Sequence, residues 1–156
     1  MSDGENNIKV IENDTNEEMK GLLKALENET NSSILDLTNN DIKTHKNNIL
    51  QMAQIGGKEL KEYHKKLKHY RYVRGMHDLQ YGCYIRWIPL KNPENIYLTK
   101  GAYITNLDIV TDGILIQCKT VFGRIFNIKY EECIIFQKIT NDEKILLGIL
   151  DVLNKK

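Results

Sequence analysis

Between residues 15 and 74 the apolar positions recur at helical spacing, with polar residues on the remaining faces. Thr15 and Glu18 form a capping box, a pattern in which two side chains satisfy the free backbone N–H groups at the start of a helix. Apolar residues follow at the spacing of a single helix face. The pattern therefore predicts a short amphipathic helix over residues 16–28.

Two further helices are expected before the pattern changes. The second begins at Thr38, and the third covers about residues 58–70. Gly56 and Gly57 lie between them, and each glycine costs about 1 kcal/mol inside a helix, so we expect two helices broken there. Ile42, Ile49, Gly56, Tyr63 and Tyr70 nevertheless lie seven positions apart, so one continuous coiled coil is the alternative, weakened by the glycine in its seam. That coiled coil would support a homodimer.

The segment before these helices, residues 1–14, is polar and rich in asparagine, with few apolar side chains to bury. Burying so few apolar side chains gives too little free energy to offset the conformational entropy that the segment would lose on becoming ordered. We therefore expect a disordered acidic tail, followed by a helical segment over residues 15–74 and a β-domain over residues 75–156.

From Gly75 onward the helical spacing gives way to the two-residue alternation of strands. Asp112 and Gly113, placed directly before another apolar run, are a hairpin signal. Five short strands are expected, at about residues 83–90, 102–110, 114–119, 124–130 and 133–139. Within the first of them, Ile85 and Trp87 share one face.

Strands this short leave costly edges, and curling the meander into a barrel removes most of them. We therefore predict an α+β fold, with N-terminal helices followed by a five-stranded SH3-like antiparallel β-barrel and a C-terminal helix. An OB-like barrel is the alternative. Thr140 and Glu143 form a second capping box, and a broad apolar stripe follows it. This stripe needs a cover, either an open end of the barrel or the groove of a partner.

The apolar runs, the N-terminal residues and the spacing of the cysteines all favour a protein of a reducing compartment. No apolar run approaches the roughly 20 residues that span a bilayer, and the N-terminus lacks the pattern of a signal peptide. Cys83, Cys118 and Cys133 are odd in number and widely spaced, which argues against disulfides and zinc. We expect buried, reduced thiols, a cytoplasmic location and no membrane partner.

Catalysis often needs a histidine, and the histidines of this chain are poorly arranged for it. His64 and His69 are five residues apart, so on a helix they point to different faces and cannot share a metal. His77 with Cys83 or Cys133 would be a base–nucleophile pair, but a loop histidine and buried thiols are the simpler interpretation. No hydrolase, zinc-protease or phosphate-loop motif is present. We expect no enzyme, no catalytic residues, no metal and no cofactor.

The total charge of +1 conceals a strongly basic stretch. Residues 49–74 carry seven lysines and arginines against two glutamates, a net charge of +5. Lysine and arginine neutralise phosphates, and tyrosine stacks on bases. The residues predicted to contact nucleic acid or an acidic partner are Lys61, Lys65, Lys66, Lys68, Tyr70, Arg71, Tyr72 and Arg74. The alternative is a solvated helix face.

A second candidate surface lies on the expected barrel. Small barrels of this type bind peptides or modified side chains through aromatic grooves. The groove residues would be Tyr84, Arg86, Trp87, Tyr103 and Phe122. Ordinary core packing is the alternative for these side chains.

From Tyr70 onward the chain resembles short, uncharacterised proteins of giant DNA viruses, of the mimivirus type and their algal-virus relatives. The residues that carry the resemblance are Tyr70 to Val73, Gly82 to Ile88, Cys118 with Lys119, and Cys133 to Lys138. The abundance of Asn, Ile and Lys also suits an AT-rich genome. The resemblance implies a viral setting, in the host cytoplasm or the virion, and assigns no functional residue.

Together these observations favour a non-enzymatic binding or scaffold module that acts through the small barrel and the adjacent basic helix. The virion is one place where it would act, and a protein is the expected partner. The alternative is a nucleic-acid-binding accessory factor in viral transcription or genome packaging.

Overall fold

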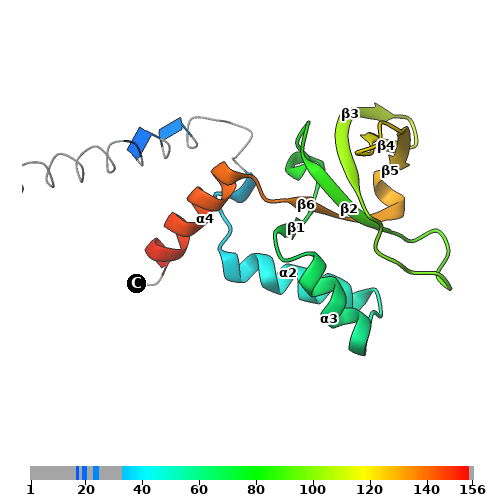
Figure 1. Ribbon diagram of the computed structural model, residues 1–156, viewed down its shortest axis with the longest axis horizontal. Helices are drawn as coiled ribbons and strands as arrows, with labels where there is room; N and C mark the ends of the chain where they lie inside the picture. The colour runs from blue at the N-terminus through cyan, green and yellow to red at the C-terminus, as the bar shows by residue number, and fades with distance from the viewer. Residues whose placement is uncertain (1–16, 18, 21–22, 25–32, 155–156) are drawn as a thin grey trace, which may run out of the picture. The chain divides into compact units, whose positions relative to one another are not determined.

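The computed structural model describes residues 17, 19–20, 23–24 and 33–154 (Figure 1). The predicted tail over residues 1–14 lies outside the described residues. Of the predicted helix over residues 16–28, the described positions are helical. The described residues form two compact units, one from those up to Asn39 together with those from Thr140 onward, and the other from Asn40–Ile139.

Within the described residues, the fold is α+β, with two helices before an antiparallel sheet and one helix after it. The helices are α2 (Asn39–Met52), α3 (Gly57–Lys66) and α4 (Asn141–Asn154), with short 3-10 turns η2 (Met76–Asp78) and η3 (Tyr130–Glu132). The strands are β1 (Tyr70–Tyr72), β2 (Tyr84–Pro89), β3 (Ala102–Val110), β4 (Gly113–Lys119), β5 (Ile125–Lys129) and β6 (Cys133–Lys138). Their order in the sheet is β1-β6-β2-β3-β4-β5.

The predicted break between two helices is confirmed, and the continuous coiled coil is wrong. The chain turns after α2 with positive φ at Gln54 (61°) and again at Gly57 (59°), the first residue of α3, and the interior of an α-helix does not contain this conformation. The third helix ends at Lys66, several residues earlier than predicted, because the chain then enters β1 and pairs with β6. Homodimerisation through this segment stays a prediction.

The predicted five-stranded closed barrel is wrong, because the sheet has six strands and does not close. A barrel closes only when its two edge strands pair. Here β1 is one edge and β5 the other, and in the described part of the chain β5 pairs with β4 alone. The last strand, β6, already has β1 on one side and β2 on the other, so neither of its edges is open to β5.

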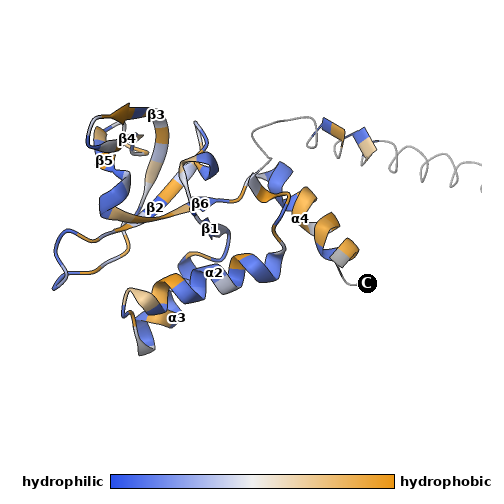
Figure 2. Ribbon diagram, turned by 180° about the vertical axis from the view of Figure 1, so that it is seen from behind, coloured by the Kyte–Doolittle hydropathy of each residue, from blue (hydrophilic) through white to orange (hydrophobic). Residues whose placement is uncertain are grey.

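The neighbouring strands β2 and β6 have apolar residues packed against both of their faces. On one face Ile85 and Trp87 pack in a core with residues of β3, β4 and β6, as their predicted shared face requires. On the other face Ile88 and Phe136 pack against Leu67 and other apolar residues of the α2–α3 region. In Figure 1, α2 and α3 lie side by side next to the β1–β6–β2 end of the sheet. Figure 2 shows apolar and polar positions mixed along both helices, as expected for helices with one buried face.

The second capping box is confirmed at the start of α4. The Thr140 N–H donates to Glu143 Oε1 (3.0 Å), and the Glu143 N–H donates to Thr140 Oγ1 (3.1 Å). In the same unit Asn39 donates two hydrogen bonds to the Asp151 carboxylate. The barrel end on which this helix was expected to pack is not formed. No helix in the described ranges has the length and apolarity needed to cross a membrane.

Candidate functional site

A row of tyrosines and lysines crosses one face of the sheet at the ends of its strands. Tyr70 of β1 pairs with Lys138 of β6, and the register of β2 against β6 places Tyr84 beside Lys138. Tyr84 pairs with Tyr103 of β3, which in turn pairs with Lys119 of β4. Directly paired residues share a face of a sheet, so these five side chains form one line across five strands. We call this line the tyrosine row.

Local contacts hold the middle of the tyrosine row in place. The rings of Tyr84 and Tyr103 meet edge to face, with centroids 4.9 Å apart. The Tyr84 hydroxyl donates to the carbonyl of Lys100 (2.7 Å), and Nε of the adjacent Arg86 donates to the carbonyl of Thr99 (2.9 Å). Gly101 makes this packing possible, because a Cβ at that position would collide with both the Tyr84 ring and the Arg86 side chain.

The hydroxyls of Tyr70 and Tyr84 keep their protons. Burial raises the pKa of Tyr70 and of Tyr84 above the ordinary value, and the charge of Arg86 acts in the opposite direction on both. The influence of Arg86 on both hydroxyls means that its guanidinium lies close to the row. The row therefore offers aromatic rings next to cations from Arg86, Lys119 and Lys138.

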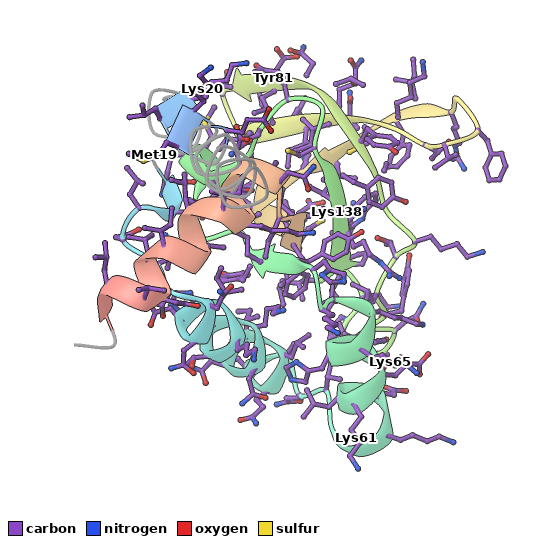
Figure 3. The ribbon with its side chains drawn as sticks, turned by 60° about the vertical axis from the view of Figure 1, so that its left-hand side comes forward. Met19, Lys20, Lys61, Lys65, Tyr81 and Lys138 are labelled. Atoms are coloured by element: carbon purple, nitrogen blue, oxygen red, sulfur yellow. The ribbon has the colours of Figure 1, made fainter. Side chains whose placement is uncertain are left out.

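Four exposed lysines precede Tyr70, the β1 residue of the tyrosine row, in the sequence. Lys58, Lys61, Lys65 and Lys68 recur at helical spacing along α3 and just beyond it, and all are exposed. Figure 3 shows Lys61 and Lys65 on α3 and Lys138 on the sheet. We call these four residues the lysine stripe. Lys68 is two residues before Tyr70, so the two features are connected through the chain.

A buried lysine ties the end of α3 to α2. Lys46 is 5% exposed, and its Nζ donates to the carbonyls of Leu67 (2.9 Å) and Lys68 (3.5 Å). Burial lowers the pKa of Lys46, and the nearby charge of Lys43 adds to the effect. A cation at carbonyls that end a helix also complements the helix dipole. Lys46 thus holds in place the short segment that connects α3 to β1 and that carries Lys68 of the lysine stripe.

The remaining residues predicted from the basic stretch have other contacts. Arg71 is 1% exposed and forms an ion pair with Asp78, with Nη1 and Oδ1 3.1 Å apart. Nε of Arg74 lies 3.7 Å from Asp78 Oδ2, and the Arg74 backbone N–H donates to the same oxygen (2.8 Å). Tyr72 packs against Phe136, with ring centroids 6.1 Å apart.

Lys66 differs from the lysines of the stripe, because its Nζ lies 2.8 Å from Oε1 of Glu62. Of the eight residues predicted from the basic stretch, Lys61, Lys65, Lys68 and Tyr70 therefore belong to the surface described above.

The predicted aromatic groove is divided between two faces of the sheet. Tyr84, Arg86 and Tyr103 lie together at the tyrosine row. Trp87 points to the opposite face, where its ring packs against Phe126 in the core. Phe122 is 98% exposed in the turn between β4 and β5, outside the paired positions that form the row.

Sequence reasoning missed Lys119 and Lys138. Each is the last residue of an apolar strand, and that position is the only sequence signal that could have drawn attention to them. The strand register, which places Lys138 beside Tyr70 and Tyr84 and places Lys119 beside Tyr103, is not readable from such a signal.

Burial disfavours the thiolate form at two of the three cysteines. Burial raises the pKa of Cys118 to about 12 and that of Cys133 to about 11, so both thiols are protonated and weakly nucleophilic at neutral pH. His77 is exposed, with Nε2 3.6 Å from Asp78 Oδ1. Burial lowers the pKa of His64, which shares a hydrogen bond with Asn47.

Across the described ranges, no group of three or more His, Cys, Asp or Glu side chains is arranged to hold a metal ion. Comparison with protein-family models, with curated proteins and with solved structures found no match to this chain.

Proposed function

We propose that this protein is a binding module and that it recognises single-stranded nucleic acid on the tyrosine row. The observation that carries the proposal is the row itself, in which three tyrosines and two lysines from five strands line up on one face. Proteins that bind single strands combine aromatic rings, on which bases stack, with cations that neutralise the phosphates. The tyrosine row supplies both groups.

The dimensions and charge of the row suit a short run of nucleotides. Five neighbouring strands span about 19 Å, since adjacent strands lie roughly 4.8 Å apart. Tyr103 is 46% exposed, so its ring is open to a base, while Lys119 and Lys138 are exposed at either side of the tyrosine pair. The lysine stripe would provide further cations for the phosphates of the bound nucleic acid beyond Tyr70. Duplex bases are stacked already, so a flat aromatic row favours single strands.

The test measures affinity of the full chain for fluorescein-labelled oligodeoxythymidine and oligouridine of about 12 nucleotides, by fluorescence anisotropy. We expect binding that weakens steeply between about 50 and 200 mM salt, with a log–log slope near −0.7 for each phosphate contacted. Replacing both Lys119 and Lys138 with glutamine should make that slope shallower by about 1.4. The variant Lys144→Gln, on α4, is the control and should leave the slope unchanged.

Stacking is tested by Tyr103→Ala, with Tyr97→Ala as a matched control. Both tyrosines are 46% exposed, but Tyr97 lies in the loop between β2 and β3 and outside the row. Loss of one stacking partner costs about 1–3 kcal/mol, so Tyr103→Ala should weaken binding roughly 5- to 150-fold. Equal losses for the two variants, or a salt-independent affinity, would refute the proposal. Unfolding followed by the fluorescence of Trp87 verifies that each variant folds.

A further inference from the structure

The edge of the sheet formed by β5 carries features that nucleic-acid binding does not use. In the described part of the chain β5 pairs only with β4, so alternate N–H and C=O groups of β5 point away from the sheet. The strand and the turn before it expose apolar side chains, including Ile125 (60% exposed) and Phe122 (98% exposed). An open apolar edge of this kind is a template for another strand.

A cleft of about 430 Å³ lies beside this edge. Its apolar lining comes from Trp87 and Pro89 of β2, Leu115 of β4, Ile128 of β5 and Cys133 of β6. The cleft therefore lies where β5 faces β2 and β6, at the opening that a closed barrel would not have. An apolar side chain on a strand added to β5 would have this cleft within its reach.

The charges around the cleft favour an acidic occupant. Lys91 and Lys129 contribute to its lining, and both are exposed, against the single carboxylate of Glu132. Two cations and one anion give a net charge of +1 at the cleft. Arg124 adds a further cation directly before β5. A segment with acidic side chains would therefore be attracted along the length of the edge.

We propose that β5 binds an extended peptide segment by strand addition, with one apolar side chain of the peptide in the cleft and its acidic side chains against Lys91 and Lys129. In this mode the main-chain hydrogen bonds provide affinity, and the pocket for alternate side chains provides specificity. The site is independent of the proposed nucleic-acid surface, because none of its residues belongs to the tyrosine row or the lysine stripe.

The test uses the full chain and a labelled peptide of about ten residues in which glutamate alternates with valine or isoleucine. We expect saturable binding, together with slower amide hydrogen exchange at Ile125–Lys129, which reports pairing along β5. The variant with both Lys91→Glu and Lys129→Glu should bind about tenfold more weakly or worse. Lys144→Glu, which makes an equal change of charge per site on α4, is the control and should bind as the parent protein does.

Two altered peptides complete the test. A peptide with proline at alternate positions cannot donate the main-chain hydrogen bonds and should not bind. A peptide with lysine in place of glutamate should bind about tenfold more weakly or worse than the acidic one. Binding of the proline peptide as tight as that of the acidic one would overturn the proposal, as would binding that leaves exchange in β5 unchanged. Protection of β5 produced by raising the protein concentration alone would also overturn it, because a second copy would then occupy the edge.

Discussion

Replacing Asp78 with asparagine removes the negative charge from a pair that is withdrawn from solvent. The Arg71 side chain is 1% exposed and the Asp78 side chain 0%, and their charged atoms lie 3.1 Å apart. The carbonyl of Asp78 also accepts hydrogen bonds from Arg71 Nη2 (3.3 Å) and from Gln137 Nε2 (2.9 Å). These contacts attach the segment after β1 to β1 and β6, on the opposite face of the sheet from the tyrosine row.

The expected loss in the free energy of unfolding of Asp78→Asn follows from the burial of both Arg71 and Asp78. Removing one partner of a buried ion pair costs about 3–5 kcal/mol, because the other charge stays out of water. The carbonyl of residue 78 keeps its bonds to Arg71 and Gln137 in Asp78→Asn, so we expect the lower end, about 3 kcal/mol. In the double variant Arg71→Met, Asp78→Asn the buried cation is gone as well. The double variant should therefore recover about 1–2 kcal/mol relative to Asp78→Asn alone.

Urea unfolding followed by the fluorescence of Trp87 measures these losses. Trp87 is the single tryptophan of the chain and lies in the core of the same unit, so it reports the unfolding of that unit. With a denaturant slope of about 2 kcal/mol per molar urea, a loss of 3 kcal/mol lowers the midpoint by about 1.5 M. A loss below about 1 kcal/mol for Asp78→Asn, or a double variant no more stable than Asp78→Asn, would refute the argument.

Two further predictions concern the backbone and the thiols. Gly101→Ala should cost more than about 2 kcal/mol in urea unfolding, since φ is +96° and the new Cβ would collide with the carbonyl oxygen of Ile85. Gly123→Ala, with φ +87° and no atom within 4 Å of the new Cβ, is the control and should cost about 1 kcal/mol; equal costs would contradict the argument. Burial raises the pKa of Cys118 and Cys133 from an ordinary 9.0 to about 12 and about 11. The protonated thiols stabilise the folded state below pH 9, and this stability should be lost as pH rises through those folded values, because the unfolded chain releases the protons first. The urea midpoint should fall over that range, and iodoacetamide should label both thiols at about pH 8 only as the protein unfolds; rapid labelling of the folded protein would contradict the prediction.

Local patterns in the sequence were sufficient for several elements of this fold. The capping box at Thr140 and Glu143, the break at Gly56 and Gly57, and the hairpin turn before β4 all depend on residues within a few positions of one another. Backbone conformation over such short stretches is set by caps, glycines and side-chain alternation, all of which are visible in the sequence.

Pairing between distant strands was decided only by the tertiary structure. Tyr70 looked like the end of a helix, yet its place beside Lys138 makes it part of a sixth strand and keeps the sheet open. Likewise Arg71 looked like a free cation in a basic run, although Asp78 draws it into the interior. The place of Tyr70 is not encoded in spacing along the chain, because strand register depends on which segments far apart in the sequence bury the most apolar area together. Asp78 is close to Arg71 in the sequence, but the spacing alone does not show that both side chains are buried. The tyrosine row, assembled from five strands, exists only through that register.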